Sequence, residues 1–176
     1  MSISLHVFLR GEHMPSAAAW ARALRDHGFA AELASDFDPR TFNGYVPCPD
    51  ERSGFDYYVE PFSSANIEFG PSALSIVGDR DTVVTLRLTG RDTDLRVATA
   101  AAASLAVLTD GVLFDGESHH FIGAADALAW ARNERYEPLA TYRVRAARRR
   151  SRVQPLSVVR LLVLLALIAL LVVYWN

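Results

Sequence analysis

The sequence predicts an α+β fold: a two-layer sandwich of a mostly antiparallel sheet with helices on one face, followed by one C-terminal transmembrane helix. Strand-like stretches outnumber helical ones, and several follow one another directly, as antiparallel strands do. Three stretches with helical periodicity separate or follow them. Residues 156–176 are almost entirely apolar and fit neither pattern. We expect a ferredoxin-like arrangement for the sheet, with the apolar tail as a separate anchor.

The first 33 residues read as strand, helix and strand. Residues 3–9 alternate weakly and are rich in β-forming side chains, which predicts the first strand. A helix is expected over residues 15–27, with Gly28 as its C-terminal stop. A short strand is predicted at residues 29–33.

Residues 34–54 are the longest irregular stretch of the domain and contain the turn signals DP, NG and PCP. Loops of this length frequently carry function. Cys48 lies in this stretch and is a potential nucleophile, but no base lies near it in the sequence. An ordinary loop cysteine is the favoured interpretation, and whether the loop carries any chemistry stays open.

The stretch FDYYVEPF at residues 55–62 predicts an aromatic strand. One face would carry Phe55, Tyr57 and Val59 into the core, and the other would carry Asp56, Tyr58 and Glu60. A tyrosine between two carboxylates suits a lysine or arginine of a protein partner, so Asp56, Tyr58 and Glu60 are the candidate partner-binding residues. A solvated strand face is the alternative.

The second half of the domain predicts further strands and two helices. In order, we expect a loop with one helical turn at 63–80, a strand at 82–88, a largely buried helix from 91–94 to 110, a hairpin of 112–114 and 119–122 around DGES, and a helix at 124–135.

The hairpin carries the only cluster that resembles a metal site: Asp115, Glu117, His119 and His120. Adjacent residues on a strand point to opposite faces, so the two histidines cannot easily share one ion. The favoured interpretation is therefore that these are ordinary residues of a hairpin turn. The alternative is a small membrane-tethered enzyme or metal-binding protein that acts through these four residues.

The C-terminal run resembles a membrane span. Fifteen consecutive apolar or aromatic residues occupy 161–175, and 158–175 would rise ~27 Å as a helix, close to the ~30 Å hydrocarbon core of a bilayer. Arginines precede the run, and Tyr174 and Trp175 end it. The predicted membrane-interface anchors are Arg148, Arg149, Arg150, Arg152, Arg160, Tyr174 and Trp175.

The arginines flank one end of the span only, which places that end in the cytosol. The N-terminal residues lack the basic and long apolar regions of a signal peptide. We therefore expect a tail-anchored, single-pass protein of the bacterial inner membrane. Its parts are a cytosolic domain (1–137), a basic juxtamembrane linker (138–155) that meets anionic lipid headgroups, and an anchor in the bilayer (156–176).

Charge and composition exclude several functions. All 20 acidic residues but only 11 of the 18 basic residues precede position 142, so this part has a net charge of −9. Nucleic acid is an improbable partner for it, whereas a cationic protein suits it. All basic residues are arginine, which excludes a lysine Schiff base and a GxxxxGK phosphate loop. The GxSxG, HExxH, CxxC and GxGxxG motifs are absent, so we expect no catalytic residue and no cofactor.

The stretches DFDPRTFNGYVP, SGFDYYVEP and LAVLTDGVLFDGE together resemble small cytosolic proteobacterial domains of unassigned function. Some of these domains are toxin-immunity proteins of interbacterial secretion systems. The resemblance covers residues 1–135 and implies a non-enzymatic domain that binds another protein. It brings no catalytic residue with it.

Overall fold

The computed structural model describes residues 3–48, 53–65, 67, 69–88 and 92–141, and these residues contain one seven-stranded sheet. The strands are β1 (Ile3–Leu9), β2 (Gly44–Cys48), β3 (Ser53–Pro61), β4 (Thr82–Leu88), β5 (Val112–Asp115), β6 (His120–Gly123) and β7 (Ala140–Thr141). Their order across the sheet is β2-β3-β4-β1-β5-β6-β7, and every neighbouring pair is antiparallel. The predicted α+β class and antiparallel sheet are confirmed, whereas the ferredoxin-like arrangement is not.

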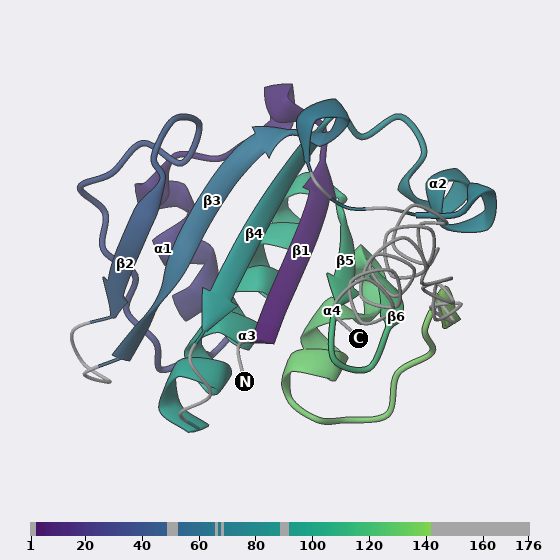
Figure 1. The fold of residues 1–176 in the computed structure, drawn as a ribbon. Helices are drawn as coiled ribbons and strands as arrows, with labels where there is room; N and C mark the ends of the chain where they lie inside the picture. Colours follow the sequence, from purple (N-terminus) through teal and green to yellow (C-terminus); the bar gives the residue numbers. More distant parts are fainter. Residues whose placement is uncertain (1–2, 49–52, 66, 68, 89–91, 142–176) are drawn as a thin grey trace, which may run out of the picture. The chain divides into compact units, whose positions relative to one another are not determined.

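The described part of the chain has four α-helices on the two sides of this sheet. They are α1 (Ala17–Asp26), α2 (Pro71–Val77), α3 (Asp92–Thr109) and α4 (Ala124–Ala131), and two short 3-10 turns, η1 (Gly11–His13) and η3 (Phe62–Ser64), accompany them. Helices α1, α3 and α4 lie behind the sheet in Figure 1, and α2 lies on the other side. The prediction that all helices share one face is therefore wrong for α2.

Helix α1 begins and ends as its sequence predicts. The Ser16 hydroxyl accepts a hydrogen bond from the Ala19 amide (3.2 Å), which satisfies one free donor of the first turn. At the other end, Gly28 adopts a left-handed φ of 75°, and the Phe29 amide donates back to the Leu24 carbonyl. This is the glycine-terminated helix end that the sequence predicts.

The main core lies between the sheet and the three helices behind it, α1, α3 and α4. Helix α3 crosses behind the central strands and presents alanines to them, so its backbone approaches the sheet closely. The space that these small side chains leave is filled from α1, where Trp20 is fully buried and donates a hydrogen bond from its ring to the Ala101 carbonyl (3.0 Å). Residues 92–109 therefore form the buried helix that the sequence predicts.

A second apolar cluster lies on the other side of the sheet, over β1, β5 and β6. Phe8, Phe114 and Phe121 point to this side, and Phe69 packs against all three rings at centroid distances of 5.2 to 5.7 Å. Helix α2 and the residues before it cover this cluster. They leave the same side of β2, β3 and β4 without a described helix over it. We call this uncovered area the open half of the sheet.

Four short segments differ from the prediction. No strand forms at residues 29–33, where Ala31 and Leu33 are buried but the chain is irregular. Strand β2 forms within the predicted irregular stretch 34–54, and β7 forms within the predicted basic linker. Helix α4 ends at Ala131, four residues earlier than expected, and Asn133 beyond it has a left-handed φ of 58°.

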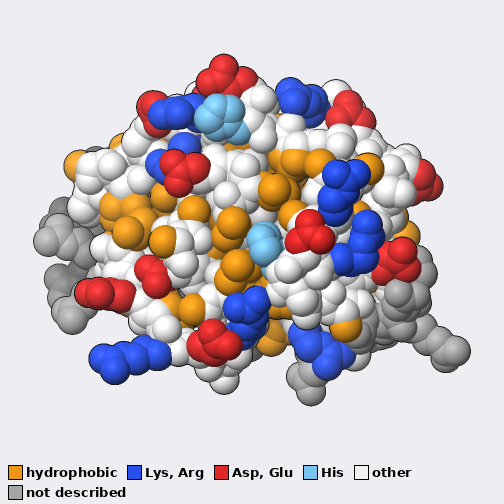
Figure 2. Space-filling view, turned by 180° about the vertical axis from the view of Figure 1, so that it is seen from behind, with side chains coloured by type: hydrophobic (Ala, Val, Ile, Leu, Met, Phe, Trp, Pro, Cys, Tyr) orange, Lys and Arg blue, Asp and Glu red, His pale blue; other side chains and the backbone are white. Residues whose placement is uncertain are grey.

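The helix-covered side carries charges of both signs. Figure 2 shows acidic and basic side chains intermixed there, with apolar side chains between them. The chain divides into two units, Met1–Arg143 and Val144–Asn176, and all described residues belong to the first. The predicted anchor, with Arg148, Arg149, Arg150, Arg152, Arg160, Tyr174 and Trp175, lies outside the described residues. Within those residues, no helix has the length and apolarity needed to cross a membrane.

Candidate functional site

The candidate partner-binding residues lie on β3 and face the open half of the sheet. Strand β3 alternates as predicted: Phe55 and Tyr57 are buried in the main core, while Asp56, Tyr58 and Glu60 are half-buried on the other side. Tyr57 is held in place by a hydrogen bond from its hydroxyl to the Pro39 carbonyl (2.6 Å). This bond ties the irregular loop before β2 to the core side of the strand.

Strand pairing brings further polar side chains to the same area. Tyr58 lies opposite Thr85 of β4, which in turn lies opposite His6 of β1. Two residues before Tyr58 in β3, Asp56 lies opposite Arg87 of β4. These side chains come from three strands that are far apart in the sequence and meet because the central strands are neighbours.

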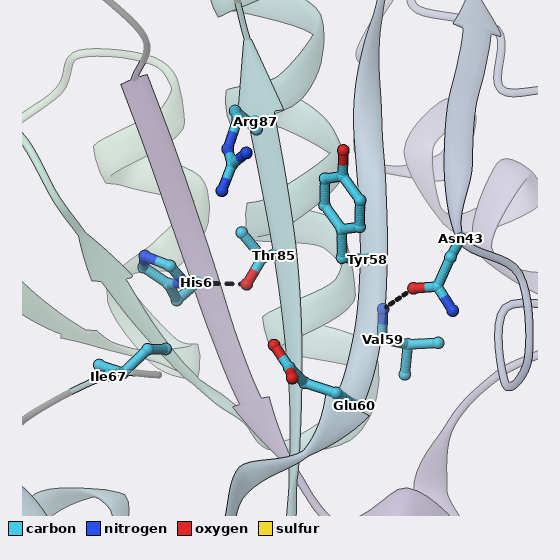
Figure 3. Close-up of a pocket in the computed structure, with 8 residues that line it drawn as sticks. All are labelled: His6, Asn43, Tyr58, Val59, Glu60, Ile67, Thr85 and Arg87. Carbon is cyan, nitrogen blue, oxygen red and sulfur yellow. Dashed lines mark hydrogen bonds between the residues drawn. The ribbon is translucent and has the colours of Figure 1, made fainter. Parts of the chain in front are cut away.

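Together they line a shallow depression of about 530 Å³. Its lining residues, which define the Tyr58 depression, are His6, Asn43, Tyr58, Val59, Glu60, Ile67, Thr85 and Arg87. Figure 3 shows Arg87 and Glu60 at opposite ends of the depression, with Thr85 and the Tyr58 ring between them. The depression therefore offers a positive end, a negative end and an aromatic ring between them.

Arg87 contacts Tyr58 directly. Its guanidinium carbon lies 5.4 Å from the centre of the Tyr58 ring, within the range of a cation–π interaction. The predicted arrangement left that ring face free for an arginine of a partner. The structure places the chain's own arginine there instead.

His6 forms part of the floor. Its Nδ1 atom shares a hydrogen bond of 3.0 Å with the Thr85 hydroxyl, and its ring stacks on Phe114. Burial, together with the neighbouring positive charge of Arg87, lowers the pKa of His6 to about 4. The ring is therefore neutral at pH 7 and acts there as a hydrogen-bonding group and not as a cation.

Asn43 fixes the rim of the depression nearest β2. Its side-chain oxygen accepts a hydrogen bond from the Val59 amide (3.0 Å), so the loop before β2 is attached to β3 at this point. On the opposite side, Ile67 comes from the segment that covers the second apolar cluster. The depression thus lies at the step between the covered and the open half of the sheet.

The sequence interpretation missed His6, Thr85 and Arg87. A signal for them exists, because the polar residues Ser4 and His6 alternate with apolar residues in β1, as Thr85 and Arg87 do in β4. Alternation shows that these residues share a face of their own strand. It does not show which strands are neighbours, and that is what brings them to Tyr58.

The hairpin of β5 and β6 does not assemble the predicted metal cluster. Both carboxylate oxygens of Asp115 accept hydrogen bonds within the turn, from the Glu117 amide (2.9 Å) and the Ser118 hydroxyl (2.6 Å). His119 has a left-handed φ of 58° and stacks on Phe114, and His120 Nδ1 shares a hydrogen bond with the Tyr136 hydroxyl (2.9 Å). No group of three potential metal ligands occurs among the residues that the structure describes.

A second depression, of about 460 Å³, lies beside this hairpin. Asp115 and Glu117 line it together with Leu95 of α3 and Trp130 of α4. The histidines of the hairpin are not among its lining residues, so the four residues of the predicted cluster do not converge on one cavity.

Cys48 is not a loop residue. It lies at the end of β2, where it is 1% exposed and packs in the main core. Burial of this kind is typical of a structural cysteine and removes the thiol from contact with a substrate.

Comparison with known proteins adds no relative. No protein-family model, no curated protein and no solved structure matches this chain.

Proposed function

We propose that this chain is a tail-anchored, single-pass protein of the bacterial inner membrane whose cytosolic domain binds another protein through the open half of the sheet. The observation that supports the binding role is the Tyr58 depression. It is wide and shallow, and it combines an aromatic ring with charges of both signs. Protein interfaces concentrate their binding energy in tyrosine and arginine side chains of this kind.

The resemblance to immunity proteins agrees with this proposal. A protein that neutralises a toxin by binding needs a contact surface and no reaction site. The alternative, an enzyme or metal-binding protein at the hairpin, gains no support from the described contacts, because Asp115 and His120 are engaged within the domain.

Arg87 changes the partner that we expect. A purely cationic surface would meet Glu60 and Asp56 favourably, but it would also meet the guanidinium of Arg87. A partner that fits both ends presents a basic side chain to Glu60 and an acidic one to Arg87. We therefore propose a partner surface with one charge of each sign, in place of a uniformly basic one.

The membrane role rests on the sequence. The apolar run at 161–175, the arginines before it and the terminal Tyr174 and Trp175 are the features of a membrane span with its basic flank in the cytosol. The arginine cluster would contact anionic lipid headgroups, each arginine contributing about 1 kcal/mol near the surface.

A photo-crosslinking amino acid at position 58 tests the binding role in cells that produce the full chain. We expect a discrete protein adduct at this position and none with the same amino acid at Leu108, which is exposed on α3 on the other side of the sheet. Glu60→Arg should remove the adduct, because it reverses the charge offered to the partner.

An adduct of the same size at both positions would show that the crosslinks are non-specific. An adduct at position 58 that still forms in Glu60→Arg would show that the partner makes no favourable contact with the negative, Glu60 end of the depression. Either result contradicts the proposed interface.

A further inference from the structure

We propose that α2 and Leu139 form a second contact surface, one that rests on the headgroup region of the lipid bilayer. This inference depends on the proposed membrane anchor. It concerns the orientation of the domain on the membrane, which neither the anchor nor the Tyr58 depression determines. We call this area the α2 surface.

The α2 surface exposes two large apolar side chains. Leu74 of α2 is 45% exposed, and Leu139, just before β7, is 55% exposed. The other face of α2 is fully engaged, since Ala73 and Val77 are buried in the second apolar cluster. Leu74 is thus an apolar residue on the outside of a helix that is already packed.

The two segments of the α2 surface contain no charged side chain, although Asp79 and Arg80 come just after α2 and Arg80 donates a hydrogen bond to the Val77 carbonyl (3.0 Å). No charged residue occurs from Phe69 to Gly78 or from Pro138 to Tyr142. Exposed apolar residues are compatible with the membrane interface, whereas carboxylates are repelled by anionic lipid.

Contacts in the second apolar cluster join the two parts of the surface. Phe69, which precedes α2, packs on Phe121 of β6 with ring centres 5.3 Å apart. Phe121 pairs with Ala140 of β7, and its carbonyl accepts a hydrogen bond from the Leu139 amide (2.8 Å). Leu139, through the Phe121 backbone, and the residue before α2, through the Phe121 ring, are therefore both attached to Phe121.

The chain continues toward its anchor from this surface. Thr141 ends β7, and the 14 residues from 142 to 155 separate it from the predicted span. Fully extended, they would reach ~50 Å at most, and their arginines favour contact with lipid. A tethered acidic domain should turn an apolar part of its surface to the membrane, and exposed Leu139 lies just before the residues that lead to the anchor.

Spin labels test this directly in the full chain, reconstituted in vesicles of phosphatidylcholine and phosphatidylglycerol. Nitroxides are attached to Leu74→Cys and Leu139→Cys, and to Leu108→Cys as a matched leucine, 40% exposed, on α3. Cys48 is buried, and the chain without an added cysteine measures any labelling of it. Flotation with the vesicles is measured first.

We expect labels at positions 74 and 139 to lose collisions with a water-soluble nickel complex and gain collisions with oxygen when the chain is in vesicles. The label at position 108 should stay accessible to nickel. Equal nickel access at all three positions in chains that float would overturn the α2 surface while leaving the anchor intact. Chains that do not float would overturn the anchor, and this inference with it.

Discussion

His6 lies in the middle of the sheet, between Thr85 and Phe114, and its pKa is lowered to about 4 by burial and by Arg87. In the unfolded chain its pKa is near 6.5, so between pH 6.5 and 4 the unfolded state binds a proton that the folded state does not. Its contribution to stability is therefore lost as the pH falls through this window.

From pH 7 to pH 5 this loss amounts to about 2 kcal/mol. Urea unfolding of the unit 1–143 should show it in the wild type, and His6→Gln should make the change between the two pH values smaller by that amount. His13→Gln, which makes the same substitution at an exposed histidine, is the control variant. An equal pH dependence in His6→Gln and wild type would contradict the assignment.

Tyr57 and Tyr58 are adjacent in sequence but differ in their surroundings. The Tyr57 hydroxyl is buried and donates to the Pro39 carbonyl, whereas Tyr58 faces the open half of the sheet. We expect Tyr57→Phe to lower the free energy of unfolding by about 1–2 kcal/mol, because a buried acceptor loses its donor. Tyr58→Phe should change it by less than ~0.5 kcal/mol. Chemical denaturation of both variants at pH 7 measures the difference, and equal losses would mean that the Pro39 contact is unimportant.

At the scale of single residues, the sequence was informative where periodicity decides the answer. Alternation along β3 correctly separated Phe55 and Tyr57 from Tyr58, because a strand turns successive side chains to opposite faces. It could not place Arg87 over the Tyr58 ring, since the two residues are 29 positions apart in the sequence and their contact depends on the register between β3 and β4.

At the scale of elements, the long strands and the short hairpin of β5 and β6 were predicted, whereas β2 and β7 were not. Strands β1 and β4 have the predicted bounds. Strand β2 was missed because Pro47 reads as a turn residue, although proline is tolerated on an edge strand, where no neighbour needs its missing amide. Residues 29–33 have the alternation of a strand but find no partner, and strands exist only as pairs.

Strand β7 has only two residues, yet it closes the described sheet beyond β6. We expect a chain that ends at Glu137, the boundary predicted from the sequence, to be less stable than one that ends at Arg143. It lacks the bond from Leu139 to the Phe121 carbonyl, and it uncovers the Phe121 ring on which Ala140 packs. The loss should be about 1–3 kcal/mol in thermal or urea unfolding. Equal stabilities would show that β7 does not support the domain.

At the scale of the whole molecule, the described unit informs on fold and binding, whereas the apolar tail informs on location. The unit Met1–Arg143 contains the two apolar clusters and the Tyr58 depression that the described residues form. The tail, by contrast, was interpreted from composition alone, because an apolar run with a basic flank has a meaning that does not depend on the rest of the fold. This is why location is easier to infer from this sequence than activity is.

The orientation of the anchor gives the final prediction. Every arginine of the chain lies at or before position 160, and no lysine occurs, so trypsin has no cleavage site in residues 161–176. If the basic flank is cytosolic, trypsin added to intact spheroplasts should leave the chain whole, and lysis should expose the arginines at 143–152 to cleavage. A known periplasmic protein must be digested in both samples, and a known cytosolic protein only after lysis. Cleavage of this chain in intact spheroplasts would place the basic flank outside. That result would reverse the topology, because the domain and its proposed partner would then both have to be periplasmic.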